Sequence, residues 1–99
     1  MRAIHLARLD KTRPVLILTR EAASGARDVT VAGITSTIRG VATEVSVGKA
    51  NGLDHDCVVN LDDVQTIRRD DLRRFLGYLD AKQEPDLRRA LIRAFHLDD

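Results

Sequence analysis

The segment VTVAGITSTIRGVATEVSV, residues 29–47, carries the pattern on which the fold prediction rests. Two β-branched runs, Val29–Val31 and Thr43–Val47, lie within it and are separated by two glycines. β-branched residues favour strands, and glycines between them mark turns. Similar runs lie on either side, at Val15–Leu18 and Val58–Leu61. Short strands with closely spaced turn signals predict a small antiparallel barrel or sandwich.

The two ends of the chain complete this plan. Alternating residues from Ile4 to Leu9 predict a half-exposed first strand. Near the other end, Asp70–Arg74 is interpreted as a short helical turn and Phe75–Leu79 as a last strand. A terminal helix is predicted from Glu84, because the apolar residues that follow it repeat at i, i+3, i+4, i+7 and i+8: Leu87, Ala90, Leu91, Ala94 and Phe95.

The start of this helix has two interpretations. Pro85 fits the first helical position, where a missing N–H costs nothing. Asp80 and Gln83 have the spacing of a capping box, which would start the helix earlier. The apolar stripe and the small size of the chain also favour a homodimer.

Composition limits what this chain can be. Its 99 residues, 11.0 kDa, predict one domain over residues 1–99. The 16 basic and 15 acidic residues give a net charge of +1, so nucleic acid cannot be bound through bulk charge and any contact needs a local basic patch. With 3% aromatic residues and no Trp, a platform of several aromatic side chains that stacks bases is not expected.

The sequence gives no signal for export or for a membrane. One cysteine excludes an intramolecular disulfide and a zinc site built on several cysteines. Charged residues interrupt the first twenty positions, and the longest uncharged run, Val29–Ile38, is about half of a membrane span. A cytoplasmic protein without membrane contact is therefore expected.

Several possible cofactor and metal motifs fail. Gly48-Lys49 lacks the upstream glycine and the following Ser or Thr of a phosphate loop. Asp54–Cys57 holds four ligand types in a row, but neighbouring residues of a strand point to opposite faces. We therefore predict no cofactor and no metal.

Two segments suggest phosphate chemistry. In the first, Pro14 biases Arg13 towards extended geometry at the start of a strand. A guanidinium group matches two phosphate oxygens and keeps its charge. In the second, Thr35, Ser36 and Thr37 offer three consecutive hydroxyls ahead of Arg39. Taken alone, either segment is also explained as an ordinary strand end.

Together, these segments resemble the MazF/PemK family of toxin endoribonucleases. That family has an Arg-Pro ahead of a hydrophobic strand, here Arg13–Leu18. A Thr/Ser segment with a basic turn and Thr-Glu-Val follows, here Ile34–Val45. A Val-Val-Asn-Leu-Asp signature comes last, here Val58–Asp62, which continues to Leu79. The resemblance extends from about Ile4 to Leu97.

The resemblance implies an SH3-like β-barrel with a terminal helix that works as a homodimer. It also implies metal-free cleavage of single-stranded RNA by 2′-OH attack, giving 2′,3′-cyclic phosphate and 5′-OH ends. A cognate MazE-like antitoxin would hold the enzyme inactive. The catalytic positions correspond to Arg13 and Thr35, and the expected RNA contacts are Ser36, Thr37, Arg39 and Lys49.

The chain also departs from the family. Many relatives have a longer loop after the first strand, with a Glu that is proposed as an acid or base. Here Leu9–Thr12 leads directly to Arg13, so that Glu is missing and Asp10 is the acidic residue nearby. Position 63, often Gln or Asn in relatives, is Asp63. Two alternatives remain open: a CcdB-like toxin that binds DNA gyrase without cutting, and a non-catalytic RNA-binding barrel.

Overall fold

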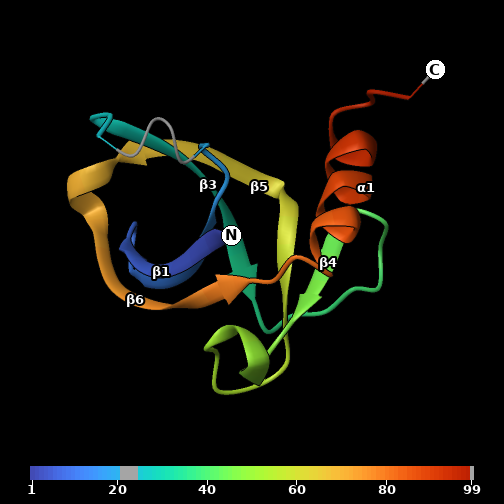
Figure 1. Ribbon diagram of the computed structural model, residues 1–99, viewed down its shortest axis with the longest axis horizontal. Helices are drawn as coiled ribbons and strands as arrows, with labels where there is room; N and C mark the ends of the chain where they lie inside the picture. Colours follow the sequence, from blue (N-terminus) through green and yellow to red (C-terminus); the bar gives the residue numbers. More distant parts are fainter. Residues whose placement is uncertain (21–24, 99) are drawn as a thin grey trace.

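The computed structural model describes residues 1–20 and 25–98, which form a curled antiparallel sheet and a C-terminal helix (Figure 1). The sheet has six strands in the order β4-β5-β3-β2-β1-β6. Their bounds are β1 Arg2–Arg8, β2 Thr12–Ile17, β3 Asp28–Thr35, β4 Glu44–Val47, β5 Cys57–Arg68 and β6 Leu72–Leu79. Two 3₁₀ turns, η2 Lys49–Asn51 and η3 Arg69–Asp71, precede β5 and β6, and α1 spans Glu84–Ala94.

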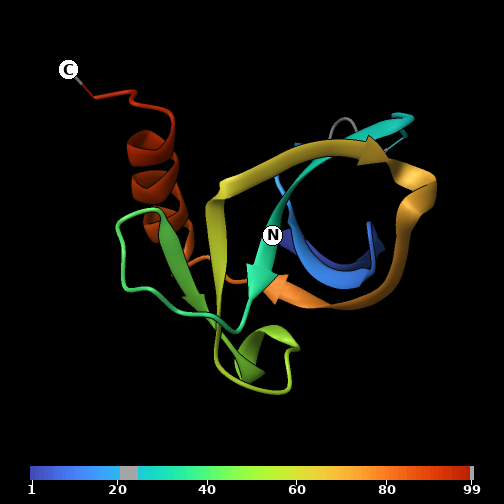
Figure 2. The same cartoon turned by 180° about the vertical axis from the view of Figure 1, so that it is seen from behind.

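The curl of the sheet depends on a bend in β5. The register against β3 changes between Ala32, which pairs with Val64, and Gly33, which pairs with Asn60. Three residues of β5 are therefore inserted at this point, and a bulge of this kind bends a strand and increases its twist. Both views show β5 turning a corner here (Figures 1 and 2). The predicted small barrel is confirmed as a half-barrel, with β4 and β6 as its outer strands.

Both faces of the sheet are packed. The larger core joins one face to α1 through residues such as Ile4, Leu16 and Leu79. The smaller core lies on the other face and contains Ala7, Val15, Val29 and Val31. In β1 to β3, alternate residues enter one core or the other. In β6, the large side chains of Phe75 and Tyr78 enter neither core and stay 47% and 45% exposed.

The apolar stripe of α1 packs into the core of its own chain. Leu87 and Ala90 are each 1% exposed, and Leu91 and Ala94 pack against the same cluster. The sequence predicts that this stripe favours a dimer, but of its five residues only Phe95 is exposed. A dimer must therefore use another surface.

In the C-terminal third of the chain, the structure agrees with the predicted start of the helix and differs from the predicted helical turn before the last strand. The predicted helical turn at Asp70–Arg74 is too long, because η3 ends at Asp71 and the chain then pairs with β1 as β6. The helix begins at Glu84, as predicted. The capping-box bonds nevertheless form one turn earlier: Gln83 N–H donates to Asp80 Oδ1, and Asp80 N–H donates to Gln83 Oε1, both at 3.0 Å.

Two glycines allow η2 to pack against β6. Gly52 has φ +91°, and a Cβ there would lie 1.9 Å from the Leu76 carbonyl oxygen. A Cβ on Gly77 would lie 2.3 Å from the carbonyl oxygen of Asn51. This close approach fixes the turn that carries Lys49. In the described residues, no helix combines the length and the apolar character that crossing a membrane requires.

Candidate active site

Arg13 lies near the start of β2 with its side chain 45% exposed. It pairs with Ala7 of β1, so the backbone is held in the sheet while the guanidinium group reaches solvent. Its Nη2 donates to Asp10 Oδ2 at 3.3 Å. The short β1–β2 turn thus brings a carboxylate to the arginine three residues later.

Thr35 is the last residue of β3 and is half-buried. Its Oγ1 accepts a hydrogen bond from the Thr37 N–H at 3.1 Å. A threonine hydroxyl has two acceptor lone pairs and one proton. Within the described residues, no acceptor takes that proton, so it can be donated to a ligand.

The strand register relates Arg13 to Thr35. The β2–β3 pairs run from Ile17 opposite Val31 to Val15 opposite Gly33. Arg13 and Thr35 each lie two residues beyond the last pair of this ladder, Val15 with Gly33. The sheet therefore brings both residues to the same end of the β2–β3 ladder.

The loop that follows Thr35, residues 36–43, is organised by Glu44. Its carboxylate accepts backbone N–H bonds from Arg39 at 3.2 Å, Gly40 at 2.8 Å and Val41 at 3.4 Å. The Arg39 side chain adds a bond from Nε at 3.4 Å. The Glu44 side chain is only 4% exposed. One carboxylate at the start of β4 thus holds the whole basic turn.

These contacts determine the ionisation of Glu44. Desolvation by itself raises the pKa of this carboxyl, since burial disfavours charge. The backbone N–H groups of Arg39, Gly40 and Val41, with the Arg39 side chain, outweigh that effect and lower the pKa below its ordinary value of 4.5. Glu44 therefore stays ionised near neutral pH and keeps its hydrogen bonds to the loop.

A second carboxylate anchors the same loop from β5. Asp62 Oδ2 accepts from Thr43 Oγ1 at 2.7 Å and from Arg39 Nη2 at 3.4 Å. Asp62 is itself oriented by Asn60, whose Oδ1 accepts the Asp62 N–H at 3.0 Å. The polar residues of the Val-Val-Asn-Leu-Asp signature therefore connect the β5 bulge to the basic turn.

The other expected RNA contacts are distributed around this loop. Ser36 and Thr37 are exposed. Arg39 is 51% exposed, but its guanidinium group already bridges Glu44 and Asp62. Lys49 is exposed and lines a groove of about 450 Å³ together with Ile38 from the loop.

Asp63 of β5 lies beside β3. Its Oδ2 would be 2.3 Å from a Cβ on Gly33, two residues before Thr35. The acidic side chain at this position therefore packs over β3, and the glycine leaves room for it.

Comparison with known proteins identifies the family. The model of the PemK-like, MazF-like toxin of type II toxin–antitoxin systems matches residues 5–95. The chain belongs to this family. The fold and the family implied by the sequence resemblance are both confirmed.

Individual relatives are similar over nearly the whole length of this PemK/MazF chain. Endoribonuclease MazF3 of Mycobacterium tuberculosis is 57% identical over 99 residues, which cover 99% of this chain and 96% of the relative. The structure of the M. tuberculosis toxin MazF-mt6 superposes with a TM-score of 0.95 at 56% identity, covering 99% of this chain and 100% of that one. An endoribonuclease from a mycobacterial species, in complex with its cognate antitoxin, superposes with a TM-score of 0.86 at 26% identity, covering 98% and 94%.

Sequence reasoning missed two residues of this PemK/MazF site. Glu44 and Asp62 were noted only as letters of family motifs, although they hold the loop that carries the candidate RNA contacts. The signal available for Glu44 is an acidic residue four positions after the Arg39-Gly40 turn.

Across residues 1–20 and 25–98, no three His, Cys, Asp or Glu side chains gather in a group that could hold a metal ion.

Proposed function

We propose that this chain is an endoribonuclease toxin that cuts single-stranded RNA and is held inactive by a cognate antitoxin. The observation that supports the proposal is that Arg13 and Thr35 lie just beyond the same end of the β2–β3 ladder in a PemK/MazF fold. Relatives named as endoribonucleases support it, one of them in complex with its antitoxin.

The proposed reaction needs no cofactor. The ribose 2′-OH attacks the adjacent phosphorus, and the bond from phosphorus to the 5′ oxygen of the next nucleotide breaks. The products are a 2′,3′-cyclic phosphate and a 5′-OH. The 2′-OH loses one proton and the leaving 5′ oxygen takes up one, so the reaction balances. Negative charge grows on the phosphoryl oxygens during this step, so preorganised donors aimed at them supply the main catalytic effect.

We assign the charge stabilisation to Arg13 and the neutral donor to Thr35. A guanidinium group is a poor general base, so Arg13 is assigned an electrostatic role. The Thr35 proton donates to a phosphoryl oxygen or orients the 2′-OH, while the Thr37 N–H holds the Thr35 oxygen in place. Ser36, Thr37, Arg39 and Lys49 are proposed as RNA contacts along the loop and groove.

Two rival functions make different predictions. A CcdB-like toxin that binds DNA gyrase needs no phosphate-directed pair such as Arg13 and Thr35. A non-catalytic RNA-binding barrel retards RNA on a gel without producing ends. Incubating the purified protein with a long transcript tests all three, because only the proposed function generates new 5′-OH ends. An intact transcript after prolonged incubation at excess protein contradicts the proposal.

The proposed assembly is a homodimer that binds a MazE-like antitoxin in the cytoplasm, where its RNA substrate is found. The dimer surface lies outside the buried stripe of α1. No step of the proposed function involves a membrane.

Chelation is expected to leave cleavage unchanged. Arg13 already supplies the fixed positive charge that a divalent ion would bring to the phosphate. Cleavage of a transcript is measured with and without excess EDTA, at constant ionic strength. Loss of activity in EDTA that added Mg²⁺ or Mn²⁺ restores would contradict the metal-free route.

Asp10 is expected to act as a partner of Arg13 and not as the missing base. The Lys11 backbone N–H, and next the charge of Arg13, lower the pKa of the Asp10 carboxyl below its ordinary value. A base that weak is a poor proton acceptor near neutral pH. We expect Asp10→Asn to change the cleavage rate less than about fivefold, as for an exposed ion pair.

The pH–rate profile makes this test decisive. Between pH 5 and 8, which is the range in which a catalytic base operates near neutrality, Asp10→Asn and wild type should have the same profile. Disappearance of an acidic limb in Asp10→Asn, or a rate loss as large as that of an Arg13 variant, would assign the base to Asp10 instead.

A further inference from the structure

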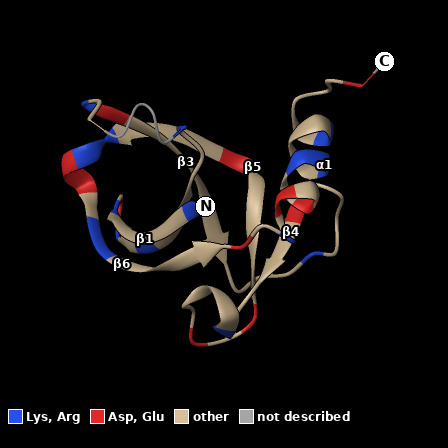
Figure 3. Cartoon of the chain, in the orientation of Figure 1, with Lys and Arg blue, Asp and Glu red and all other residues tan. Residues whose placement is uncertain are grey.

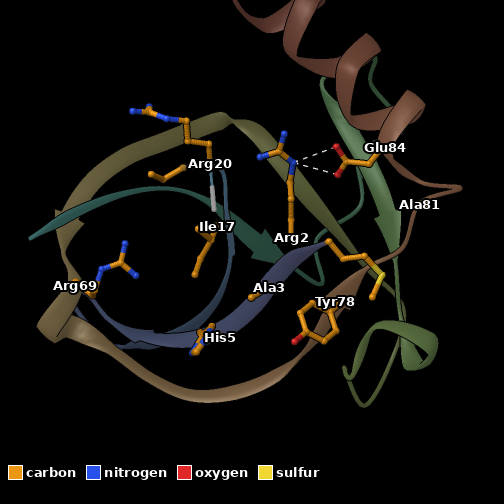
Figure 4. Close-up of a pocket in the computed structure, with 11 residues that line it drawn as sticks. Arg2, Ala3, His5, Ile17, Arg20, Arg69, Tyr78, Ala81 and Glu84 are labelled. Atoms are coloured by element: carbon orange, nitrogen blue, oxygen red, sulfur yellow. Dashed lines mark hydrogen bonds and ion pairs between the residues drawn. The ribbon is translucent and has the colours of Figure 1, made fainter. Parts of the chain in front are cut away.

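A cavity of about 570 Å³ opens inside the curve of the sheet, and Arg13 and Thr35 do not line it (Figure 4). Ala3, Ile17 and Ala81 contribute apolar wall to it. Cavities of roughly 300–1,000 Å³ with apolar walls and a few polar groups are typical of small-molecule sites.

Aromatic rings form one side of this cavity. Tyr78 and His5 line it, and Phe75 connects them. The His5 and Phe75 rings meet edge to face with centroids 5.5 Å apart, and Phe75 and Tyr78 do so at 5.0 Å. Two of the chain's three aromatic residues are therefore gathered here, which the low aromatic content did not predict. The contacts hold the rings in place, so a planar ligand does not have to order them.

His5 also has a defined hydrogen-bonding edge. Its Nδ1 lies 2.9 Å from the Arg73 carbonyl oxygen, which can only accept. Nδ1 therefore carries the proton, and in the neutral ring Nε2 is left as an acceptor. Such an acceptor suits the N–H groups on the edge of a nucleobase.

Positive charge surrounds the cavity. Arg2, Arg20 and Arg69 line it, with Glu84 as the acidic lining residue. Arg2 Nε donates a hydrogen bond to Glu84 Oε2 at 3.1 Å, and Arg2 Nη1 donates one to the Leu18 carbonyl oxygen at 2.7 Å. Arg20 is exposed and has no partner in the described part of the chain. Basic residues also lie at the end of β5 and at the start of β6, with Asp70 and Asp71 between them (Figure 3).

We propose that this cavity is a second nucleotide-binding site, which takes one unstacked nucleotide with its base against Tyr78 and His5 and its phosphate at Arg20. A nucleotide joins a planar base and an anionic phosphate in one unit, and the cavity places ring faces beside guanidinium groups. An acidic peptide would satisfy the arginines, but it has no planar base edge to donate to His5.

The nucleotide has two possible sources, the RNA strand or the free nucleotide pool. The first source rests on the proposed function. Ile17 lines the cavity and lies on the same face of β2 as Arg13, four residues away, or about 13 Å at roughly 3.3 Å per residue. One strand of RNA can therefore occupy both places, with the cavity holding a base a few positions from the cut.

Tyrosine fluorescence provides a direct test, because Tyr78 is the only Tyr and the chain has no Trp. Wild-type protein is titrated with adenosine 5′-monophosphate and with a DNA octamer, which lacks the 2′-OH and is not cut. We expect saturable quenching of Tyr78 emission by the mononucleotide. Quenching by the octamer at lower concentration assigns the site to a strand, and quenching by the mononucleotide alone assigns it to free nucleotides.

Arg20→Glu should weaken this quenching at least about tenfold, since it reverses the charge that meets the phosphate. The matched control is Arg88→Glu, at an exposed position of α1, which should bind as wild type does. If Arg20→Glu does not fold, amide NMR shifts of wild type decide: Ala3 and Ala81 should move with adenosine 5′-monophosphate, and the buried Leu87 should not.

Two results would overturn the second site. One is the absence of saturable quenching together with unmoved Ala3 and Ala81 amides. The other is an acidic peptide that quenches Tyr78 and displaces both nucleotide probes. Transcript cleavage is scored separately, so quenching without cleavage refutes the proposed function alone, and cleavage without quenching refutes the second site alone.

Discussion

Arg13→Ala should fold normally and cleave RNA at least about 10²–10³-fold more slowly than wild type, the usual cost of removing one preorganised donor from developing charge. The side chain is 45% exposed and belongs to neither core cluster. Its loss therefore removes charge from the phosphate without opening a cavity in the protein. Single-turnover cleavage of a transcript, with the urea midpoint of each variant, measures both effects.

Arg13→Lys and Arg88→Ala sharpen the interpretation. Lysine keeps the charge but not the planar fork of donors, so Arg13→Lys should fall between wild type and Arg13→Ala. Arg88 is an exposed arginine of α1, and its removal tests the loss of one positive charge outside β2, β3 and the loop that follows Thr35. A folded Arg13→Ala protein that cuts at the wild-type rate would remove Arg13 from the mechanism and would favour one of the non-nuclease alternatives.

The strands and the helix were predictable because their signals are local. β-branched runs and glycine turns marked β2, β3, β4 and the first part of β5, and the stripe from Leu87 to Phe95 marked α1. Pairing with a partner strand is not a local signal. It extends β5 to Arg68 through the polar residues after Leu61, and it converts Arg73 and Arg74 from an expected helical turn into β6.

The site was predictable only in part, for the same reason. Spacing suggested phosphate chemistry at Arg13 and Thr35, and the family resemblance supplied their roles. The ladder that brings them to the same end of β2 and β3 exists only in the paired sheet. The cavity inside the sheet joins residues as distant as His5 and Tyr78, which meet because β1 and β6 pair. No sequence window contains both.

Glu44→Ala should be the most damaging substitution outside the residues that touch the phosphate. We expect cleavage to fall roughly 10²-fold, the effect of displacing positioned groups by about 1 Å. The carboxylate holds three N–H groups of the loop between Thr35 and β4, so its removal frees the segment that presents Ser36, Thr37 and Arg39. The measurement is kcat/KM on a short RNA, with circular dichroism and urea unfolding to confirm the fold.

Glu44→Gln separates the effect of the hydrogen bonds that the Glu44 side chain accepts from the effect of its negative charge. The amide oxygen still accepts hydrogen bonds, so Glu44→Gln should recover part of the activity that Glu44→Ala loses. Asp28→Ala, at an exposed position at the start of β3, is the control and should behave as wild type.

The pKa of Glu44 is lower in the folded chain than in the unfolded one. The stabilisation from Glu44 is therefore complete above its ordinary pKa of 4.5 and disappears as pH falls through the folded value. Unfolding followed from pH 7 towards pH 3 should show this loss in wild type and a flatter dependence in Glu44→Gln. Equal pH dependence in the two proteins, or full activity in folded Glu44→Ala, would show that the loop is held without this carboxylate.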